Sequence, residues 1–304
     1  MKLLLTGGSA NGKSTLGEKM ALDLTGPHYY LAAMRPYGPE SFERIARHRA
    51  SHNRKGFITI ERYTALDTLC LPKRGTVLLE CLCNLLDNEL FSHNSHFKSI
   101  NVVEQIFQGL ESISNQCDNL LVVTNDVGSD WPSYPPSTLQ YAAKLGQLNC
   151  LAAAFADAVL EVVAGIPLLR RGTLNSPLMK HLENSGKGDS HMILVIGAEA
   201  SGKRTFVKEL GFQEAEMSPI LEDACPVLTD LHRMVAQDPL HCGELLPKLL
   251  HKRVVICNEV GSGIIPDTPQ GRLAREQTGR MCVLLAQEAA RVVRMVCGIP
   301  TILK

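Results

Sequence analysis

Two short stretches of the chain carry residues of the kind that bind phosphate. The first, GGSANGKST, fits the pattern Gly-x-x-x-x-Gly-Lys-Ser and stands between an apolar segment and a helical one. In such a loop, converging backbone N–H groups and a helix N-terminus surround phosphate oxygens. Lys13 would contact the β- and γ-phosphates, and the Ser14 hydroxyl would bind Mg²⁺. We expect the nucleotide-binding loop to consist of Gly7, Gly8, Ser9, Ala10, Asn11, Gly12, Lys13, Ser14 and Thr15.

The second stretch, GAEASGKRT over residues 197–205, resembles the first but differs at the metal-binding position. Arg204 stands where the first loop has Ser14, and a guanidinium has no lone pair to offer a cation. Glu199 also brings a carboxylate to the place where phosphates would lie. We therefore expect one working Mg-nucleotide site, at the first loop.

Glu80 ends the apolar segment TVLLE, where folds of this kind place the acidic residue that holds or polarises the Mg²⁺ shell. Because the first loop supplies a metal that needs such a residue, we favour this role for Glu80. The alternative is a strand-end carboxylate that faces water.

The segment ERIARHRASHNR is the other unusual part of the chain. Arg44, Arg47 and His48 are spaced to share one helix face, and Arg49 lies beside His48. Such a cationic cluster can anchor a triphosphate while a neutral histidine attacks phosphorus. From composition alone, a solvated basic helix is the better interpretation.

Three sequence landmarks occur twice and in the same order. They are the Gly-Lys of the loop, an Asn-acid-Val-Gly turn at 125–128 and 258–261, and a Gly-Ile-Pro at 165–167 and 298–300. The interval between the last two landmarks is 40 residues in both copies, whereas the first interval is 112 residues in one and 55 in the other. This pattern predicts a tandem duplication with a shortened second copy. We expect a first domain over 1–171, a polar linker without apolar periodicity over 172–190, and the second copy over 191–304.

Short apolar strands that alternate with amphipathic helices predict an α/β fold. The expected class is a P-loop NTPase (RecA-like), with a parallel sheet covered by helices on both faces in each tandem unit. In the first unit, strands are expected at 3–6, 29–32, 76–79, 120–124 and 158–163, and helices at 13–24, 42–51, 103–113 and 139–154.

The bulk composition excludes several classes of protein. Lys+Arg and Asp+Glu are balanced at 31 each, so no overall charge recruits nucleic acid or an anionic membrane. No apolar run approaches the roughly 20 residues that span a bilayer. The ten cysteines lack the spacing of a zinc site and indicate reduced thiols in a cytoplasmic protein.

Taken together, these motifs resemble the bifunctional adenosylcobinamide kinase / adenosylcobinamide-phosphate guanylyltransferase family of cobalamin biosynthesis. The resemblance rests on LLLTGGSANGKS, ESFERIARHR, LLECLCNLLDNELF, LLVVTNDVG and ADAVLEVVAGIP in the first unit, and on VVICNEVGSGIIPDTPQGRLAREQTGR in the second. It implies that an NTP, GTP or ATP, first phosphorylates the corrinoid adenosylcobinamide with Mg²⁺ as cofactor. GTP then guanylylates a histidine, and the GMP passes to the cobinamide phosphate. By the family's Arg-Ile-x-x-His pattern this histidine is His48, with Arg44 and Arg49 among the nucleotide-binding residues, whereas His52 lies outside the pattern.

The two units depart from the family in complementary ways. The first has NDVGSDWPSYPP where the family has Asn-Glu-Val-Gly-x-Gly-Ile-Val-Pro, and the second keeps NEVGSGIIP. We hypothesise that the chain is a pseudo-dimer in which the second unit replaces a neighbouring subunit of a homo-oligomer and lends residues to the first site. The candidates are Asn258, Glu259, Arg272 and Arg275. The alternative is a second unit that only supports packing. For the whole chain, the alternatives are guanylyl transfer alone, or a degenerate nucleotide-binding regulator or corrinoid sensor.

Overall fold

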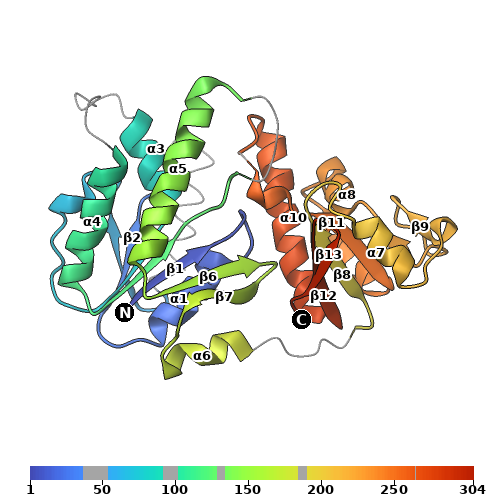
Figure 1. Cartoon of the computed structure of the whole chain (residues 1–304), viewed down its shortest axis with the longest axis horizontal. Coiled ribbons are helices and arrows are strands. Elements are labelled where there is room, and N and C mark those ends of the chain that lie inside the picture. The colour runs from blue at the N-terminus through green and yellow to red at the C-terminus, as the bar shows by residue number, and fades with distance from the viewer. Residues whose placement is uncertain (37–53, 92–101, 129–133, 184–189, 264) are drawn as a thin grey trace.

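The computed structural model describes residues 1–36, 54–91, 102–128, 134–183, 190–263 and 265–304. Two β-sheets form the framework, one in each half of the chain, and helix α10 (Pro269–Glu288) lies between them (Figure 1).

The first sheet has seven strands in the order β3-β2-β4-β5-β1-β6-β7. All neighbouring strands are parallel except the last pair, in which β7 returns antiparallel to β6. The strands are β1 (Lys2–Thr6), β2 (His28–Ala32), β3 (Phe57–Glu61), β4 (Thr76–Glu80), β5 (Asn119–Val123), β6 (Ala158–Val163) and β7 (Ile166–Gly172).

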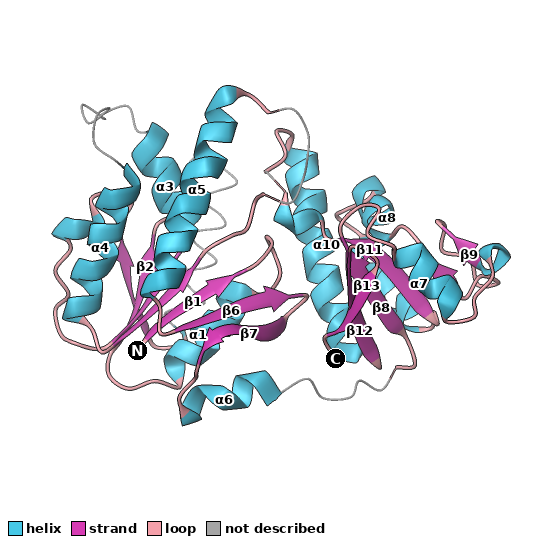
Figure 2. Cartoon of the chain, in the orientation of Figure 1, coloured by secondary structure: helices cyan, strands magenta, loops and turns pink. Residues whose placement is uncertain are grey.

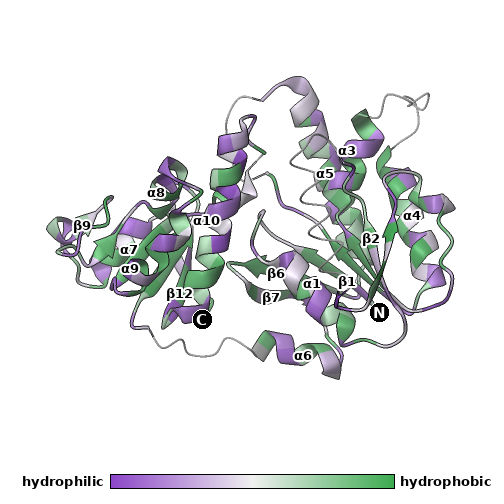
Figure 3. Cartoon of the chain, turned by 180° about the vertical axis from the view of Figure 1, so that it is seen from behind, coloured by the Kyte–Doolittle hydropathy of each residue, from purple (hydrophilic) through white to green (hydrophobic). Residues whose placement is uncertain are grey.

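Helices cover both faces of this sheet, as expected for an α/β fold (Figure 2). One apolar cluster joins the sheet to α3 (Leu82–Phe91), α4 (Val102–Gln116) and α5 (Pro136–Phe155). The opposite cluster joins it to α1 (Lys13–Leu22) and α6 (Ser176–Glu183). In Figure 3 most of the sheet strands are green, which marks hydrophobic residues, whereas the helices carry both green and purple residues. A 3₁₀ turn, η1 (Leu66–Thr68), packs against α4.

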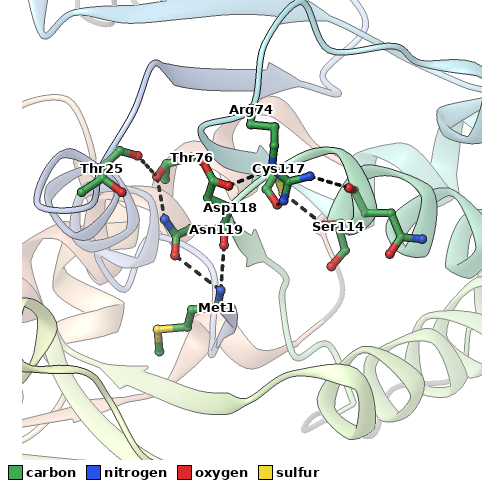
Figure 4. Close-up of polar contacts among 9 residues, drawn as sticks. Met1, Thr25, Arg74, Thr76, Ser114, Cys117, Asp118 and Asn119 are labelled. Carbon is green, nitrogen blue, oxygen red and sulfur yellow. Dashed lines mark hydrogen bonds and ion pairs between the residues drawn. The ribbon is translucent and has the colours of Figure 1, made fainter.

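At the end of the first sheet opposite to the phosphate loop, polar contacts connect the segments that precede β4 and β5 (Figure 4). The Arg74 guanidinium donates to the Asp118 carboxylate at 2.9 Å and to the Cys117 carbonyl oxygen at 2.6 Å. The Asn119 amide donates to Thr76 Oγ1 at 3.1 Å, and that hydroxyl donates to the Thr25 carbonyl oxygen. These bonds pair the polar groups of the loops that lead into β4 and β5. They hold the first ends of the two strands whose other ends lie at the phosphate loop.

The second sheet has six strands in the order β9-β10-β11-β8-β12-β13, and only the β12–β13 pair is antiparallel. This is the arrangement of the first sheet without its β3 edge strand. The strands are β8 (Ile193–Gly197), β9 (Met217–Ser218), β10 (Val227–Leu228), β11 (Val254–Asn258), β12 (Arg291–Val296) and β13 (Ile299–Ile302). The helices are α7 (Lys203–Glu209), α8 (Leu231–Gln237), α9 (Leu246–Leu250) and α10, and the 3₁₀ turns are η2 (Glu214–Glu216), η3 (Cys242–Leu245) and η4 (Val260–Ser262).

The two halves correspond at a constant offset from α5 and α10 through the strands that follow them. Helices α5 and α10 have the same length and are offset by 133 positions, and strands β6 and β12 show the same offset. The hairpin turns also agree, because φ is 49° at Ala164 and 82° at Gly165, against 51° at Cys297 and 80° at Gly298. Such left-handed pairs are uncommon outside glycine, so the agreement reflects one shared turn geometry.

The expectation of a polar linker without apolar periodicity over 172–190 was wrong for its first part. Residues 176–183 form helix α6, whose Leu178 side chain is fully buried on the first sheet. The Lys180 ammonium and the His181 ring bond the Asp23 carboxylate at 2.8 and 2.6 Å. Leu174, Leu178 and Leu182 recur every four residues, which is a helical spacing that a polar composition conceals. Residues 184–189 lie outside the described part.

Candidate active site

The first phosphate loop joins β1 to α1 and has the backbone that the sequence predicts. Gly12 precedes the helix with φ 87°, and Ala10 is also left-handed with φ 58°. The buried Lys13 side chain folds back over the loop, and its ammonium donates to the carbonyl oxygens of Gly7 at 3.0 Å and Gly8 at 2.5 Å. Burial lowers the pKa of Lys13 to about 8. The loop's own carbonyl oxygens therefore hold the lysine side chain over the loop.

The two predicted metal ligands meet at the carboxyl end of β4. Ser14 Oγ donates to one carboxylate oxygen of Glu80, and the Tyr30 hydroxyl donates to the other at 2.7 Å. Burial and the Glu80 carboxylate together raise the pKa of Tyr30 well above its usual range, so Tyr30 remains a donor. These two hydrogen bonds fix the orientation of the Glu80 carboxylate, with one oxygen directed at Ser14.

Two cysteine thiols adjoin this cluster. Cys83 Sγ accepts a hydrogen bond from the Asn125 backbone N–H at 3.1 Å. A hydrogen bond from Cys81 lowers the pKa of Cys83 to about 7, whereas the same contact raises the pKa of Cys81. Both thiols raise the pKa of Lys13 when charged, which partly offsets the effect of burial. The sequence predicted buried reduced thiols here but gave no signal of their closeness to the loop lysine.

A cavity of about 670 Å³ opens over the loop and is lined by both halves of the chain. From the first half it takes loop residues Ser9 to Thr15 and the strand-end residues Tyr30, Thr59, Glu61, Glu80 and Asn125. From the second half it takes residues of α10 and of the turn before it: Ile265, Pro266, Arg272, Arg275, Glu276, Arg280, Val283 and Leu284. Arginine side chains of the second half therefore face the phosphate loop of the first.

Direct backbone contact holds the halves together at this cavity. The Ser9 N–H donates to the Gly261 carbonyl oxygen at 2.7 Å, and Arg275 Nη2 donates to the same oxygen at 2.6 Å. Gly279 of α10 lies so close to the loop that an added Cβ would stand 2.8 Å from Ala10 Cβ. Arg275 is 7% exposed, and its positive charge contributes to the low pKa of Lys13.

A salt bridge strengthens the same junction farther from the cavity. Arg294 of β12 bonds Glu161 of β6 at 2.7 Å and Glu259 of the second half at 2.9 Å. These contacts, with those of Arg170, hold the pKa of Glu161 below its usual value against the opposing effect of burial. The Glu161 carboxylate is therefore charged at neutral pH.

The structure separates the four second-half residues that were candidates for the first site. Arg272 and Arg275 line the shared cavity, and Arg272 also donates to the Asp267 carbonyl oxygen at 2.7 Å. Asn258 instead bonds Glu199 of the second loop, and Glu259 bonds Arg294. The expectation that Asn258 and Glu259 lie at the first site was wrong, because their strand β11 ends at the second loop.

The remaining predictions have different outcomes. The cavity contains loop residues 9–15 and Glu80, whereas Gly7 and Gly8 lie behind the loop and hold the lysine. His48, Arg44 and Arg49 lie outside the described residues. Sequence reasoning missed Tyr30, although its place in β2, next to β4, puts it beside Glu80.

The second loop has the same backbone as the first, but its charged side chains pair with groups of the second half itself. Lys203 bonds the carbonyl oxygens of Gly197 and Ala198, as Lys13 does in the first loop. Arg204 bonds Asp230 at 2.9 Å and Thr229 at 3.2 Å, at the end of β10. Because β10 corresponds to β4, Arg204 forms this ion pair at the strand end where Ser14 meets Glu80 in the first half, and by register Thr229 is the counterpart of Glu80.

Comparisons with known proteins agree with this geometry. The family model described as cobinamide kinase / cobinamide phosphate guanyltransferase, CobU, matches residues 3–169 and 227–303. The chain belongs to this family. Among curated proteins, the bifunctional adenosylcobalamin biosynthesis protein CobU of Escherichia coli (strain K12) is 28% identical over 178 residues. The protein of the same name from Salmonella typhimurium (strain LT2) is 29% identical over 181 residues, and each match covers 55% of this chain and 97% of the relative.

Family membership and the observed site concern the same residues. The matched ranges contain the first loop, Glu80 and all of α10, and they leave out the second loop at 197–205. The matched part of the second half thus includes Gly261 and Gly279, which contact the first loop. None of the helices in the described residues is long and apolar enough to cross a membrane.

Proposed function

We propose that the chain is a cobinamide kinase and cobinamide-phosphate guanylyltransferase whose nucleotide site is the cavity between its halves. The observation that carries this proposal is that one cavity is lined both by a complete phosphate loop and by arginines of the second half. In the kinase step, the substrate hydroxyl attacks the γ-phosphate of an NTP, and the NDP leaves. In the transfer step, a histidine attacks the α-phosphate of GTP and pyrophosphate leaves. The GMP then passes from the histidine to the cobinamide phosphate.

The donor set at β4 fits a magnesium ion. Within the described residues, no group of three or more His, Cys, Asp and Glu side chains is arranged to hold a metal. Mg²⁺ usually relies on one or two protein oxygen ligands together with substrate phosphates and water. Ser14 and Glu80 supply such oxygens beside the loop and would hold the ion, which neutralises phosphate charge when bound.

The loop and the arginines have separate roles in this scheme. Backbone N–H groups of the loop and Lys13 bind the phosphates, and Tyr30 keeps the Glu80 carboxylate directed at Ser14. Arg272 and Arg275 approach from α10 and counter the negative charge that spreads over the transferred phosphoryl oxygens. We assign the covalent intermediate to His48, which the family pattern indicates.

Covalent labelling tests the guanylyl transfer. The full chain is incubated with GTP labelled at the α-phosphate, alongside His48→Ala and the matched control His52→Ala. The expected result is acid-labile label on the wild type and on His52→Ala, but not on His48→Ala. Absence of label from the wild type would remove the transferase and leave the regulator hypothesis, for which GTP binds without turnover. Label without phosphorylation of adenosylcobinamide would leave guanylyl transfer alone.

A substitution in α10 tests the contribution of the second half. Arg272→Met keeps the length of the side chain but removes its charge, and Arg233→Met, in the exposed part of α8, is the control. A charged hydrogen bond to phosphate is worth about 1.5–3 kcal/mol, so we expect kcat/KM to fall at least about tenfold in Arg272→Met alone. Unchanged turnover with unchanged unfolding would favour a purely structural second half.

The two halves further support a tandem duplication with domains at 1–171 and 191–304. Their sheets have the same strand order, and α5 and α10 are offset by the same 133 residues as the hairpins that follow. In this proposal the second half keeps the elements that reach its neighbour and has lost the β3 edge strand. The chain is then a pseudo-dimer in which one half completes the site of the other.

A further inference from the structure

The contact between the halves depends on three positions of the second half. Gly261 accepts the Ser9 N–H, and Gly279 is packed against Ser9 and Ala10. Val283 lies over the first hairpin, with its Cγ1 3.0 Å from where a Cβ on Gly165 would stand. This contact buries the hairpin flanks, because Val163 is 1% and Ile166 8% exposed.

The first half has counterparts of these three positions on α5 and in the turn before it, and there they are exposed to solvent. At the offset of 133 residues, Gly261, Gly279 and Val283 correspond to Gly128, Gly146 and Cys150. All three are exposed, and nothing lies within 4 Å of a Cβ added at Gly146. The exposed face of α5 from Leu139 onward consists of the uncharged residues Leu139, Gln140, Ala143, Gly146, Gln147, Cys150, Leu151 and Ala154, and the half-exposed Lys144 lies at its edge.

The surface that would receive such a face is open in the second half. Val296 and Ile299, the counterparts of the buried Val163 and Ile166, are 50% and 66% exposed. Nothing lies within 4 Å of a Cβ added at Gly298, where the counterpart Gly165 is covered by Val283. Isolated apolar residues are common on surfaces, but here a whole hairpin end and the adjacent loop are uncovered.

We infer that a second copy of this chain docks its α5 face on the β12–β13 hairpin and the second loop, repeating between chains the contact that α10 makes within one. The occupant is a second copy because α5 is the counterpart of the helix that fills the equivalent place. Each chain then has one donating and one receiving surface, so the association is head-to-tail. The inference rests on the internal contact and on the 133-residue offset, and it does not depend on catalytic activity.

Two native cysteines provide a direct test. Cys150 corresponds to Val283, and Cys297 precedes the counterpart of Gly165, so the docked copies bring Cys150 of one chain beside Cys297 of the other. Both thiols are exposed and free, and the exposed Cys70 lies between η1 and β4, outside both surfaces. The reduced full chain is treated with a short bismaleimide crosslinker, and the products are separated by denaturing electrophoresis. Cys150→Ser, Cys297→Ser and the control Cys70→Ser are treated in parallel.

The expected result is a crosslinked product of twice the chain mass in the wild type and in Cys70→Ser. Each of the other two variants alone loses this product, and mixing them restores it, because one supplies Cys297 and the other Cys150. A wild type that is not crosslinked overturns the inference, whether light scattering finds it monomeric or associated through another surface. Crosslinking that persists in both single variants also overturns it, since like residues would then meet.

Discussion

Gly279 lies where α10 crosses the first phosphate loop, and a methyl group there tests how the halves pack. The Cβ of Gly279→Ala would lie 2.8 Å from Ala10 Cβ and 3.1 Å from the carbonyl oxygens of Ser9 and Ala10. Unstrained carbon contacts are about 3.5–4.0 Å, so the helix and the loop must move apart. Overpacking of this kind costs about 1–3 kcal/mol.

Gly146 supplies the matched control, because it holds the same position in α5 and has open space around it. Alanine is more favourable than glycine in a helix interior by about 1 kcal/mol. We therefore expect Gly146→Ala to raise the free energy of unfolding by up to about 1 kcal/mol. Gly279→Ala has the same propensity gain, and we expect its free energy of unfolding to lie about 1–3 kcal/mol below that of Gly146→Ala.

Urea unfolding in dilute solution, where chains remain separate, measures the stability difference, and calorimetric titration measures GTP binding. If the loop yields rather than the helix, the strain appears in the nucleotide site, and GTP affinity falls about tenfold for each 1.4 kcal/mol. Gly146→Ala should bind GTP as the wild type does. Equal stabilisation by both substitutions, with equal GTP affinity, would refute the packing of α10 on the loop.

Three further predictions concern the loop lysines and Glu80. Burial lowers the pKa of Lys13 to about 8. The free energy of unfolding of the nucleotide-free protein, relative to that of Lys13→Met, should therefore rise by roughly 3 kcal/mol at most between about pH 8 and 10.5. Urea unfolding measures this difference. The sign follows because the unfolded chain binds the proton more tightly, and a constant difference would contradict it. Equilibrium dialysis should find one GTP per chain, abolished by Lys13→Met and unchanged by Lys203→Met; two per chain would contradict the single site. Glu80→Gln should slow turnover at least about tenfold at saturating Mg²⁺ in a steady-state assay, and a wild-type rate would exclude Glu80 from the metal shell.

Local sequence patterns predicted five of the seven strands of the first sheet and the helices α1, α4 and α5, but not β3, β7, α3 or α6. The helix expected at 42–51 lies outside the described residues. Continuous apolar segments such as TVLLE and LLVV became β4 and β5, because strands buried on both faces of a parallel sheet need no polar alternation. The phosphate loop followed from its glycines and its lysine. The start of α5 at Pro136 was also readable, since proline is favoured in the first turn of a helix, yet the expected start was placed three residues later.

The composite site could be suspected from the sequence but not built from it. Repeat spacing indicated a second unit, and family resemblance indicated that it lends residues. Which residues it lends depends on how two folded surfaces dock. Asn258 and Glu259 were favoured because their motif is well preserved, but that motif ends strand β11 beside its own loop. Arg275 reaches the first loop because α10 packs on its own sheet through Met281 and Leu285, while Gly279 packs against the first loop.

The second loop has the backbone of the first phosphate loop but carries Arg204 where the first has Ser14. In the first half, Ser14 places only a neutral hydroxyl beside Glu80, whose carboxylate in our proposal pairs with a cation that arrives with the nucleotide. In the second half, Arg204 brings a cation that is covalently part of the chain, and it pairs with Asp230 at 2.9 Å. Asn258 likewise engages Glu199, so the loop's own carboxylate lies where a phosphate would enter. A folded unit with satisfied charges no longer needs a ligand to hold the loop, and its conserved geometry can serve as a docking surface.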